Sequence, residues 1–133
     1  KLGGYKFGAK LVRGAYMEIE RERAAEMGYP SPIYPNKAET DKGFDAAVTL
    51  MVEEIEHTAL SCGTHNEDSS QLLVDLMEKY HIAKDDPRIY FAQLLGMSDH
   101  ISFNVANEGY NVTKYVPYGP IKMVMHNILS SAQ

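Results

Sequence analysis

Four stretches of this sequence each end an apolar run with cationic, polar or glycine residues that could hold a ligand. They are residues 10–16 (KLVRGAY), 59–66 (ALSCGTHN), 89–97 (IYFAQLLGM) and 112–119 (VTKYVPYG). A cation at the carboxyl end of a strand, followed by a glycine that permits close backbone approach, is typical of the floor of a ligand site in α/β proteins. We therefore predict that the four ends meet at one shared site.

Three side chains within these stretches favour a small-molecule ligand. Lys10 lies inside a predicted strand, where a cation needs an anionic or electron-rich partner. Gln93 interrupts an apolar strand, and hydrogen bonds to a ligand ring or to neighbouring backbone would satisfy it equally well. Tyr115 could form one wall of a pocket for a small ring, or be no more than part of a stiff strand exit.

The turn at Thr64, His65 and Asn66 connects a predicted strand to a predicted helix. Free backbone N–H groups at a helix start bind phosphates, so this turn is a candidate site for a nucleotide-type ligand. Helix capping alone would explain Asn66 and Thr64, but it leaves His65 unexplained.

The composition argues against several other classes of protein. The chain has 133 residues, with 18 acidic against 13 basic residues, so it lacks the basic footprint of a nucleic-acid-binding protein. It contains no apolar run of about 18 residues, the length that a membrane-spanning helix requires. The spacing of its five histidines and its single Cys62 predict no metal site, and no G-x-S-x-G motif supports a nucleophilic serine. The lone cysteine fits a reducing, intracellular compartment.

The elements expected to position the candidate residues alternate between strands and helices. Helix formers, apolar spacing, capping residues and proline-rich breaks define their limits. The predicted strands are 10–12, 58–62, 88–94 and 112–116. Three predicted helices have clear limits, at 17–27, 100–107 and 121–129. Of the other two, one is capped by Thr40 or Asp41, and one runs from a cap at Asn66 or Asp68 to Tyr80. We read this order as βαβαβαβα, which predicts a parallel sheet with helices outside.

Four consecutive βα units are compatible with half of a (β/α)₈ TIM-type barrel or with an open doubly wound sheet. No glycine-rich G-x-G-x-x-G turn follows any predicted strand, and polar groups end every strand, so we favour the half-barrel. No internal boundary is visible, and residues 1–133 are interpreted as a single unit cut from a longer protein.

Taken together, the motifs resemble proline dehydrogenase, a family of flavin-dependent (β/α)₈ enzymes. The matching stretches are 10–16, 37–41 (KAETD), 64–66, 91–97 and 115–119, in the family's order and spacing. The sequences of these motifs are most similar to those of the monofunctional enzymes. The chain resembles strands five to eight, the C-terminal half of the catalytic barrel. The resemblance implies oxidation of L-proline to pyrroline-5-carboxylate by hydride transfer to FAD, with electrons passed to a quinone. It also implies a place in the cytoplasm or the mitochondrial matrix, peripheral to the inner membrane.

The resemblance also implies roles for particular residues. Lys10 and Tyr115 would be catalytic, with Lys10 beside the reactive N5 of the flavin and Tyr115, together with Leu95, against proline. Cofactor contacts would come from Lys10, Val12, Gly14, Ala15, Met17, Lys37, Thr64, His65, Asn66, Gln93 and Leu95. We expect the members of this set to line one concave face. A Gln93 side chain directed toward the helices, away from Lys10 and Tyr115, would remove the geometric basis for a flavin site.

One segment departs from the family pattern. Relatives carry a Tyr and an Arg-Arg pair that clamp the substrate carboxylate, whereas this chain has Asn127, Ser130 and Ser131 at those positions. Hydroxyl groups do not replace bidentate guanidinium recognition. We therefore expect residues 1–133 alone to be inactive. Because a half-barrel leaves its first and last strands unpaired, we also expect the chain to self-associate through these exposed strand edges.

Two alternatives belong to other classes of protein. One is a non-catalytic α/β fragment that associates through its sheet edges. The other is a barrel lyase that forms a Schiff base through Lys10 or Lys114.

Overall fold

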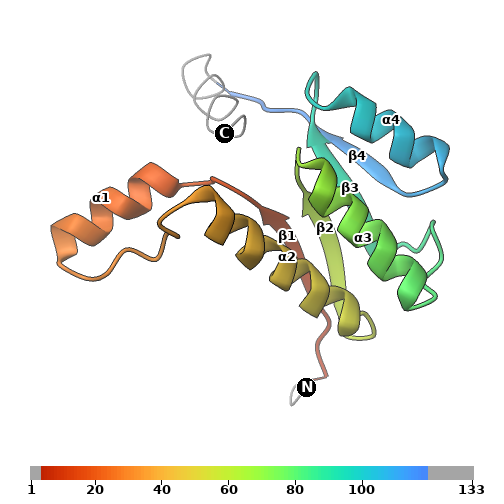
Figure 1. The fold of residues 1–133 in the computed structure, drawn as a ribbon, viewed down its shortest axis with the longest axis horizontal. Helices are drawn as coiled ribbons and strands as arrows, with labels where there is room; N and C mark the ends of the chain where they lie inside the picture. Colours follow the sequence, from red (N-terminus) through yellow and green to blue (C-terminus); the bar gives the residue numbers. More distant parts are fainter. Residues whose placement is uncertain (1–3, 120–133) are drawn as a thin grey trace.

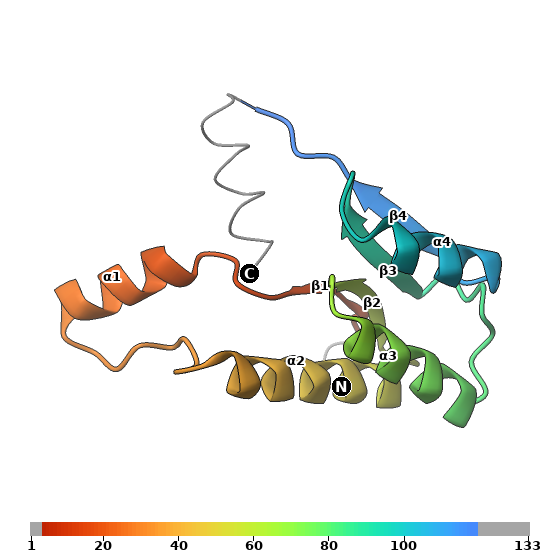
Figure 2. The same ribbon diagram turned by 45° about the horizontal axis from the view of Figure 1, so that its top comes forward.

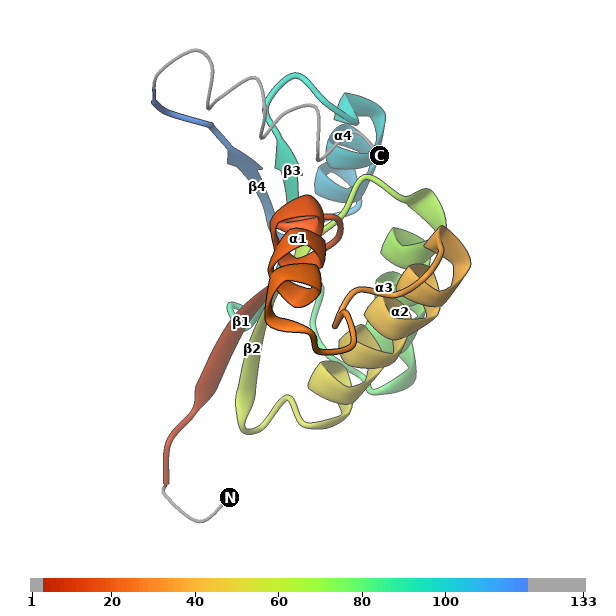
Figure 3. The same ribbon diagram turned by 90° about the vertical axis from the view of Figure 1, so that its left-hand side faces the viewer.

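The computed structural model describes residues 4–119. Its elements are β1 (Phe7–Val12), α1 (Met17–Met27), α2 (Lys37–Glu53), β2 (Thr58–Gly63), α3 (Glu67–Lys79), β3 (Ile89–Leu94), α4 (Asp99–Asn107) and β4 (Val112–Tyr115). The strands pair in the order β1-β2-β3-β4, and every neighbouring pair is parallel. Helices α2, α3 and α4 cover one face of this sheet (Figure 1, Figure 3). The predicted parallel sheet with outer helices is confirmed.

The two faces of the sheet differ because successive strand residues point in opposite directions. The helix face is mainly apolar, and its most deeply buried apolar residues, each at most 2% exposed, are Leu60, Cys62, Ile89 and Phe91. The other face has no helical cover among residues 4–119 (Figure 3). It is hollowed over about 430 Å³, and Lys10, Tyr90 and Thr113 are among the residues that line the hollow.

The core lies between the sheet and helices α2 and α3. The apolar residues predicted to share one face of α2 and its C-terminal end are all buried: Phe44, Val48, Met51, Val52 and Ile55. On α3, Leu73, Leu76 and Met77 are buried as expected, and Leu72 packs partly against the same cluster. This core fixes the helices against β2 and β3, and it thereby fixes the carboxyl ends of those strands.

Helix α2 begins three residues before its predicted cap. Asn36, in an extended conformation, caps the helix by accepting a hydrogen bond from the backbone N–H of Glu39 at 2.9 Å. Thr40 lies inside the helix, where its hydroxyl donates to the Asn36 carbonyl oxygen at 3.1 Å. The prediction of a cap at Thr40 or Asp41 was therefore wrong, because several residues of capping type follow Pro35 and the first one begins the helix.

Helix α1 has the predicted bounds but lies away from the sheet (Figure 1, Figure 2). It ends at Gly28, whose φ of 73° is the left-handed conformation that glycine adopts without strain. Ala24 is its one buried residue. None of the helices within residues 4–119 combines the length and the apolar composition needed to cross a membrane. The last predicted helix, 121–129, lies outside the described residues.

Candidate functional site

Lys10 and Tyr115 come from the two edge strands of the sheet, yet their side chains meet. The ammonium nitrogen of Lys10 lies 4.3 Å from the centroid of the Tyr115 ring. Strands β2 and β3 separate β1 from β4. Neighbouring strands are roughly 4.8 Å apart, so a flat sheet would hold its edges roughly 14 Å from each other. The contact therefore requires a strongly curved sheet that carries both side chains on its concave face.

The charge of Lys10 is available to a ligand. Among residues 4–119, Lys10 forms no ion pair, and its partner Tyr115 is 50% exposed. An exposed cation–π contact stabilises by only about 0.5–1 kcal/mol. An anionic or electron-rich group on the concave face could therefore compete with the Tyr115 ring for this ammonium group.

Gly63 makes room for Lys10 at the end of β2. A Cβ atom on this glycine would lie 2.8 Å from Val12 Cγ1, 2.9 Å from the Leu11 carbonyl oxygen and 3.2 Å from Lys10 Cε. Glycine is thus required for the close packing of the ends of β1 and β2. Gly63 lies within the stretch 59–66 singled out from the sequence, but this role could not be found there because it depends on the pairing of Val12 with Gly63 across the sheet.

Gln93 does not lie on the concave face, so that part of the predicted grouping is wrong. Its side chain is 2% exposed and shares the helix face with Ile89 and Phe91. Its amide donates to the Thr64 carbonyl oxygen at 3.3 Å, and its carbonyl oxygen accepts from the Ser102 hydroxyl of α4 at 2.9 Å. The two-residue period of β3 imposes this direction. The flavin hypothesis loses the geometric basis that Gln93 was expected to provide, and what remains is the Lys10–Tyr115 pair.

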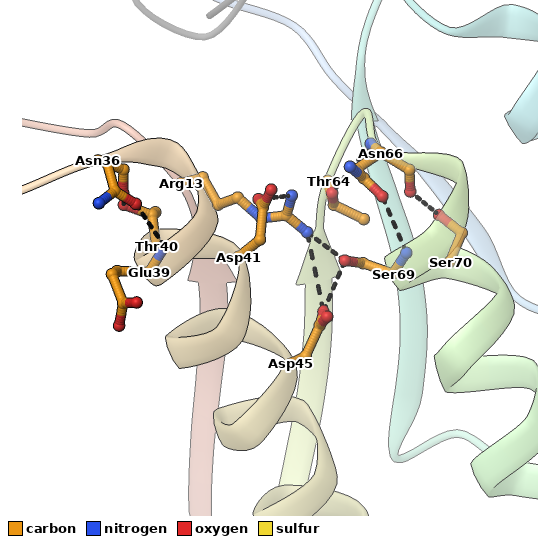
Figure 4. Close-up of polar contacts among 10 residues, drawn as sticks. All are labelled: Arg13, Asn36, Glu39, Thr40, Asp41, Asp45, Thr64, Asn66, Ser69 and Ser70. Atoms are coloured by element: carbon orange, nitrogen blue, oxygen red, sulfur yellow. Dashed lines mark hydrogen bonds and ion pairs between the residues drawn. The ribbon is translucent and has the colours of Figure 1, made fainter. Parts of the chain in front are cut away.

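The turn after β2 is organised mainly by capping. Asn66 accepts from the Ser69 backbone N–H at 3.0 Å and so caps α3, as one of the two predicted alternatives (Figure 4). Thr64 is buried, and its hydroxyl accepts from the Asn66 N–H at 3.1 Å. Acidic residues fill the first turn of α3, and their charge opposes a phosphate at this helix start. Both Thr64 and Asn66 therefore have the structural roles that capping explains.

His65 is the residue of this turn whose side chain is not used in helix capping. It is half-buried, and its Nδ1 lies 2.9 Å from the Ser98 hydroxyl. Burial lowers the pKa of His65, and the positive charge of Lys114 lowers it further. The ring is therefore neutral near pH 7, and it could give a ligand a hydrogen bond rather than a positive charge.

Lys114 serves the structure rather than a Schiff base. Its ammonium group donates to the Met97 carbonyl oxygen at 3.0 Å and to Asp99 Oδ1 at 2.7 Å. These contacts tie β4 to the start of α4. They leave the lyase alternative with Lys10 alone.

The remaining predicted cofactor residues lie at or beyond the carboxyl ends of the strands. Val12 ends β1 and is 47% exposed, and Leu95 follows β3 and is 59% exposed. Gly14, with a φ of 71°, and Ala15 form the turn into α1, which begins at Met17. Lys37 is the exposed first residue of α2. The residues that stand at the carboxylate-clamp positions of relatives are outside the described residues; they are Asn127, Ser130 and Ser131.

The curved parallel sheet and its outer helices match part of a (β/α)₈ barrel, a fold whose ligand sites lie at the carboxyl ends of the strands. Residues 1–129 match the family described as proline dehydrogenase. The chain belongs to the proline dehydrogenase family.

Similar proteins agree with this assignment. Proline dehydrogenase 1, mitochondrial, from Homo sapiens is 46% identical over 125 residues, which cover 92% of this chain and 21% of that protein. Hydroxyproline dehydrogenase from Bos taurus is 37% identical over 134 residues, covering 98% of this chain and 29% of that protein. The structure of proline utilization A from Bdellovibrio bacteriovorus, inactivated by N-propargylglycine, matches with a TM-score of 0.83 and 29% identity over 96% of this chain and 13% of that one. The chain thus spans about a fifth to three tenths of these curated relatives.

Proposed function

We propose that the full-length protein containing this chain oxidises L-proline to pyrroline-5-carboxylate with FAD as its cofactor. The observation that carries the proposal is the Lys10–Tyr115 pair, which places an ammonium group and an aromatic ring together on the concave face of a proline dehydrogenase-family sheet. In such a pair, the ammonium group can contact an electron-rich ring system while the aromatic ring packs against a small apolar ring beside it.

Lys10 and Tyr115 would divide the work at the reacting centre. When bound, FAD supplies an acceptor for the hydride that leaves the proline ring carbon beside nitrogen, and loss of the nitrogen proton completes a C=N bond. The ammonium group of Lys10 would stabilise negative charge that develops on the electron-accepting ring. The half-exposed ring of Tyr115 would pack against proline and exclude water from one side of it.

Other strand-end residues would hold the rest of the cofactor. Neutral His65 has a hydrogen bond to offer, and exposed Lys37 has a positive charge for a pyrophosphate. Val12, Gly14, Ala15, Met17 and Leu95 would line the ring and its arm. Thr64, Asn66 and Gln93 would act through the shape of the turn, since hydrogen bonds within the chain already occupy them.

The proposal extends to partners and location by way of the relatives. The relatives named mitochondrial proline dehydrogenase support a mitochondrial location. A cytoplasmic location, a position peripheral to the inner membrane and the transfer of electrons to a quinone are parts of the proposal that these names leave open.

The direct test is to purify the full-length protein and follow the reduction of a dye acceptor. We expect a yellow protein with bound FAD that reduces the dye with L-proline, and does so more slowly with trans-4-hydroxy-L-proline at the same concentration. A flavin-bound protein that reduces no dye with either substrate would contradict the proposal.

The separate 133-residue chain has a different expected behaviour. Strands β1 and β4 are the edges of the sheet within residues 4–119, and such edges pair with other chains. Asn127, Ser130 and Ser131 stand where relatives clamp the substrate carboxylate. The isolated chain should therefore sediment as a self-associated species without proline oxidation, even with added FAD. Steady proline-dependent turnover by a monomeric chain would refute this.

A further inference from the structure

Arg13 joins three elements on the helix side of the sheet, directly after β1 ends (Figure 4). Its Nη1 donates to Asp41 Oδ1 at 2.6 Å, and its Nη2 donates to the Ser69 hydroxyl and lies 4.0 Å from Asp45 Oδ1. Asp41 and Asp45 belong to α2 and Ser69 to α3. The guanidinium carbon also lies 4.2 Å from the centroid of the Phe44 ring. One side chain therefore holds the end of β1 against the N-terminal half of α2 and the first turn of α3.

The network continues from Arg13 into the turn after β2. The Ser69 hydroxyl, which accepts from Arg13, donates its proton to Asp45 Oδ1 at 2.6 Å. The backbone N–H of Ser69 donates to the Asn66 side chain at 3.0 Å. Ser69 is 1% exposed, so water does not replace these contacts. Arg13 thus connects the turn that holds Gly14 and Ala15 to the turn that holds Thr64, His65 and Asn66.

Both Nη groups of Arg13 are bound within the chain and are not free for a ligand, while its buried Nε has no hydrogen-bond partner within residues 4–119. The side chain is 17% exposed and is shared between a carboxylate at 2.6 Å, a second carboxylate at 4.0 Å and a buried hydroxyl. Its direction is toward the helices, opposite to that of Lys10. A planar guanidinium suits this task because it can bridge several acceptors at fixed angles, which an ammonium group cannot do.

We infer that Arg13 is a positioning residue for the cofactor site. It fixes the distance between the loop after β1 and the turn after β2, the two segments whose residues are proposed to hold FAD. This role rests on the proposed function. It predicts that the loss of Arg13 weakens FAD binding beyond any general loss of stability.

The experiment compares variants of the full-length protein. Arg13→Ala removes the connection, Arg13→Lys keeps the charge without the bridge, and Ser69→Ala keeps the Asp41 pair but interrupts the path to Asn66. Arg88→Ala is the matched control, because Arg88 also bonds two carboxylates, those of Asp86 and Glu56, at the amino end of β3. For each protein, the Kd for FAD is measured by flavin fluorescence on the apoprotein, the melting temperature is recorded, and kcat and KM for proline are determined.

We expect Arg13→Ala to weaken FAD binding by about ten- to a hundredfold, as misplacement of binding groups does. Arg13→Lys and Ser69→Ala should fall between it and the wild type, and Arg88→Ala should lower the melting temperature without changing the Kd. The KM for proline should change less than the Kd for FAD. Arg13→Lys and Ser69→Ala proteins that bind FAD as tightly as the wild type would overturn the inference, even if Arg13→Ala fails to fold. A wild-type protein that binds no FAD would instead overturn the proposed function, and this role with it.

Discussion

On the helix side of the sheet, Gln93 and Arg13 find their partners within the chain, whereas on the concave side Lys10 contacts the ring of Tyr115 and no carboxylate among residues 4–119. Both sides carry polar groups at the carboxyl ends of strands. The difference is that groups on the helix side hydrogen-bond to one another, while the cation on the concave side has no anionic partner among the described residues. A polar residue at a strand end is therefore a ligand-binding candidate only once its face is known.

The largest expected difference between the two faces is in thiol reactivity. Cys62 on the helix side is 0% exposed, and burial raises its pKa to about 12. Its neighbour Ser61 points to the concave side. At pH 8, a Ser61→Cys, Cys62→Ser protein should be alkylated roughly a thousandfold faster than Cys62 in the wild type, because the thiolate is the reactive form. Mass spectrometry of this peptide measures both rates, and equal rates would show that the faces are assigned wrongly.

Gly63→Ala tests the close packing beneath Lys10. The new methyl group would meet Val12 and the Leu11 backbone, and overpacking of this kind costs about 1–3 kcal/mol. Gly8→Ala is the control, since a Cβ on Gly8 would meet nothing within 4 Å. Urea unfolding of the full-length protein should show a lower midpoint for Gly63→Ala and little change for Gly8→Ala. An unchanged midpoint for both would mean that β1 and β2 are less closely packed than described.

Gln93→Leu should have a smaller effect on stability. It leaves the buried Ser102 hydroxyl without its Gln93 acceptor and the Thr64 carbonyl oxygen without its Gln93 donor. The cost of such groups is about 1–3 kcal/mol, partly offset by the added apolar contact and by the bond that Ser102 keeps to the Ser98 carbonyl oxygen. The double variant Gln93→Leu, Ser102→Ala should recover part of the lost free energy of unfolding. Normal stability together with lost FAD binding would instead return Gln93 to the cofactor-contact set.

The smallest expected effect is a pH dependence from His65. Because burial and Lys114 lower its pKa in the folded protein, the unfolded chain binds the proton more readily. The contribution of His65 to stability should therefore be constant above the ordinary histidine pKa of about 6.5 and should decline as the pH falls below it. His65→Gln should reduce this decline between pH 7 and pH 5, measured as the unfolding midpoint against pH. A slope that steepens in the variant would reverse the sign of the argument.

Much of this architecture was predictable from the sequence. The apolar spacing of α2 and α3 predicted which of their faces are buried, and Gly28 predicted the end of α1. The residue types at the strand ends singled out Lys10 and Tyr115. The direction of Gln93 was not predictable, because β3 is buried along most of its length and shows no alternation of apolar and polar residues. The roles of Arg13 and Gly63 depend on partners brought close by the sheet and helices, which no local pattern encodes.

The most direct test of the account is FAD binding and proline oxidation by the full-length protein with Lys10→Met, compared with Lys84→Met. Lys84 lies over the Tyr110 ring at 5.1 Å and pairs with Glu108 at 3.3 Å. It precedes the amino end of β3, away from the carboxyl strand ends, so it provides the loss of a cation near an aromatic ring outside the proposed site. The account predicts that Lys10→Met lowers kcat by at least about a hundredfold, the scale of a lost electrostatic contact to a reacting group, while its melting temperature stays near that of the wild type. Lys84→Met should retain wild-type activity. Equal activity of Lys10→Met and Lys84→Met would contradict the assignment of the concave face as the site of the reaction.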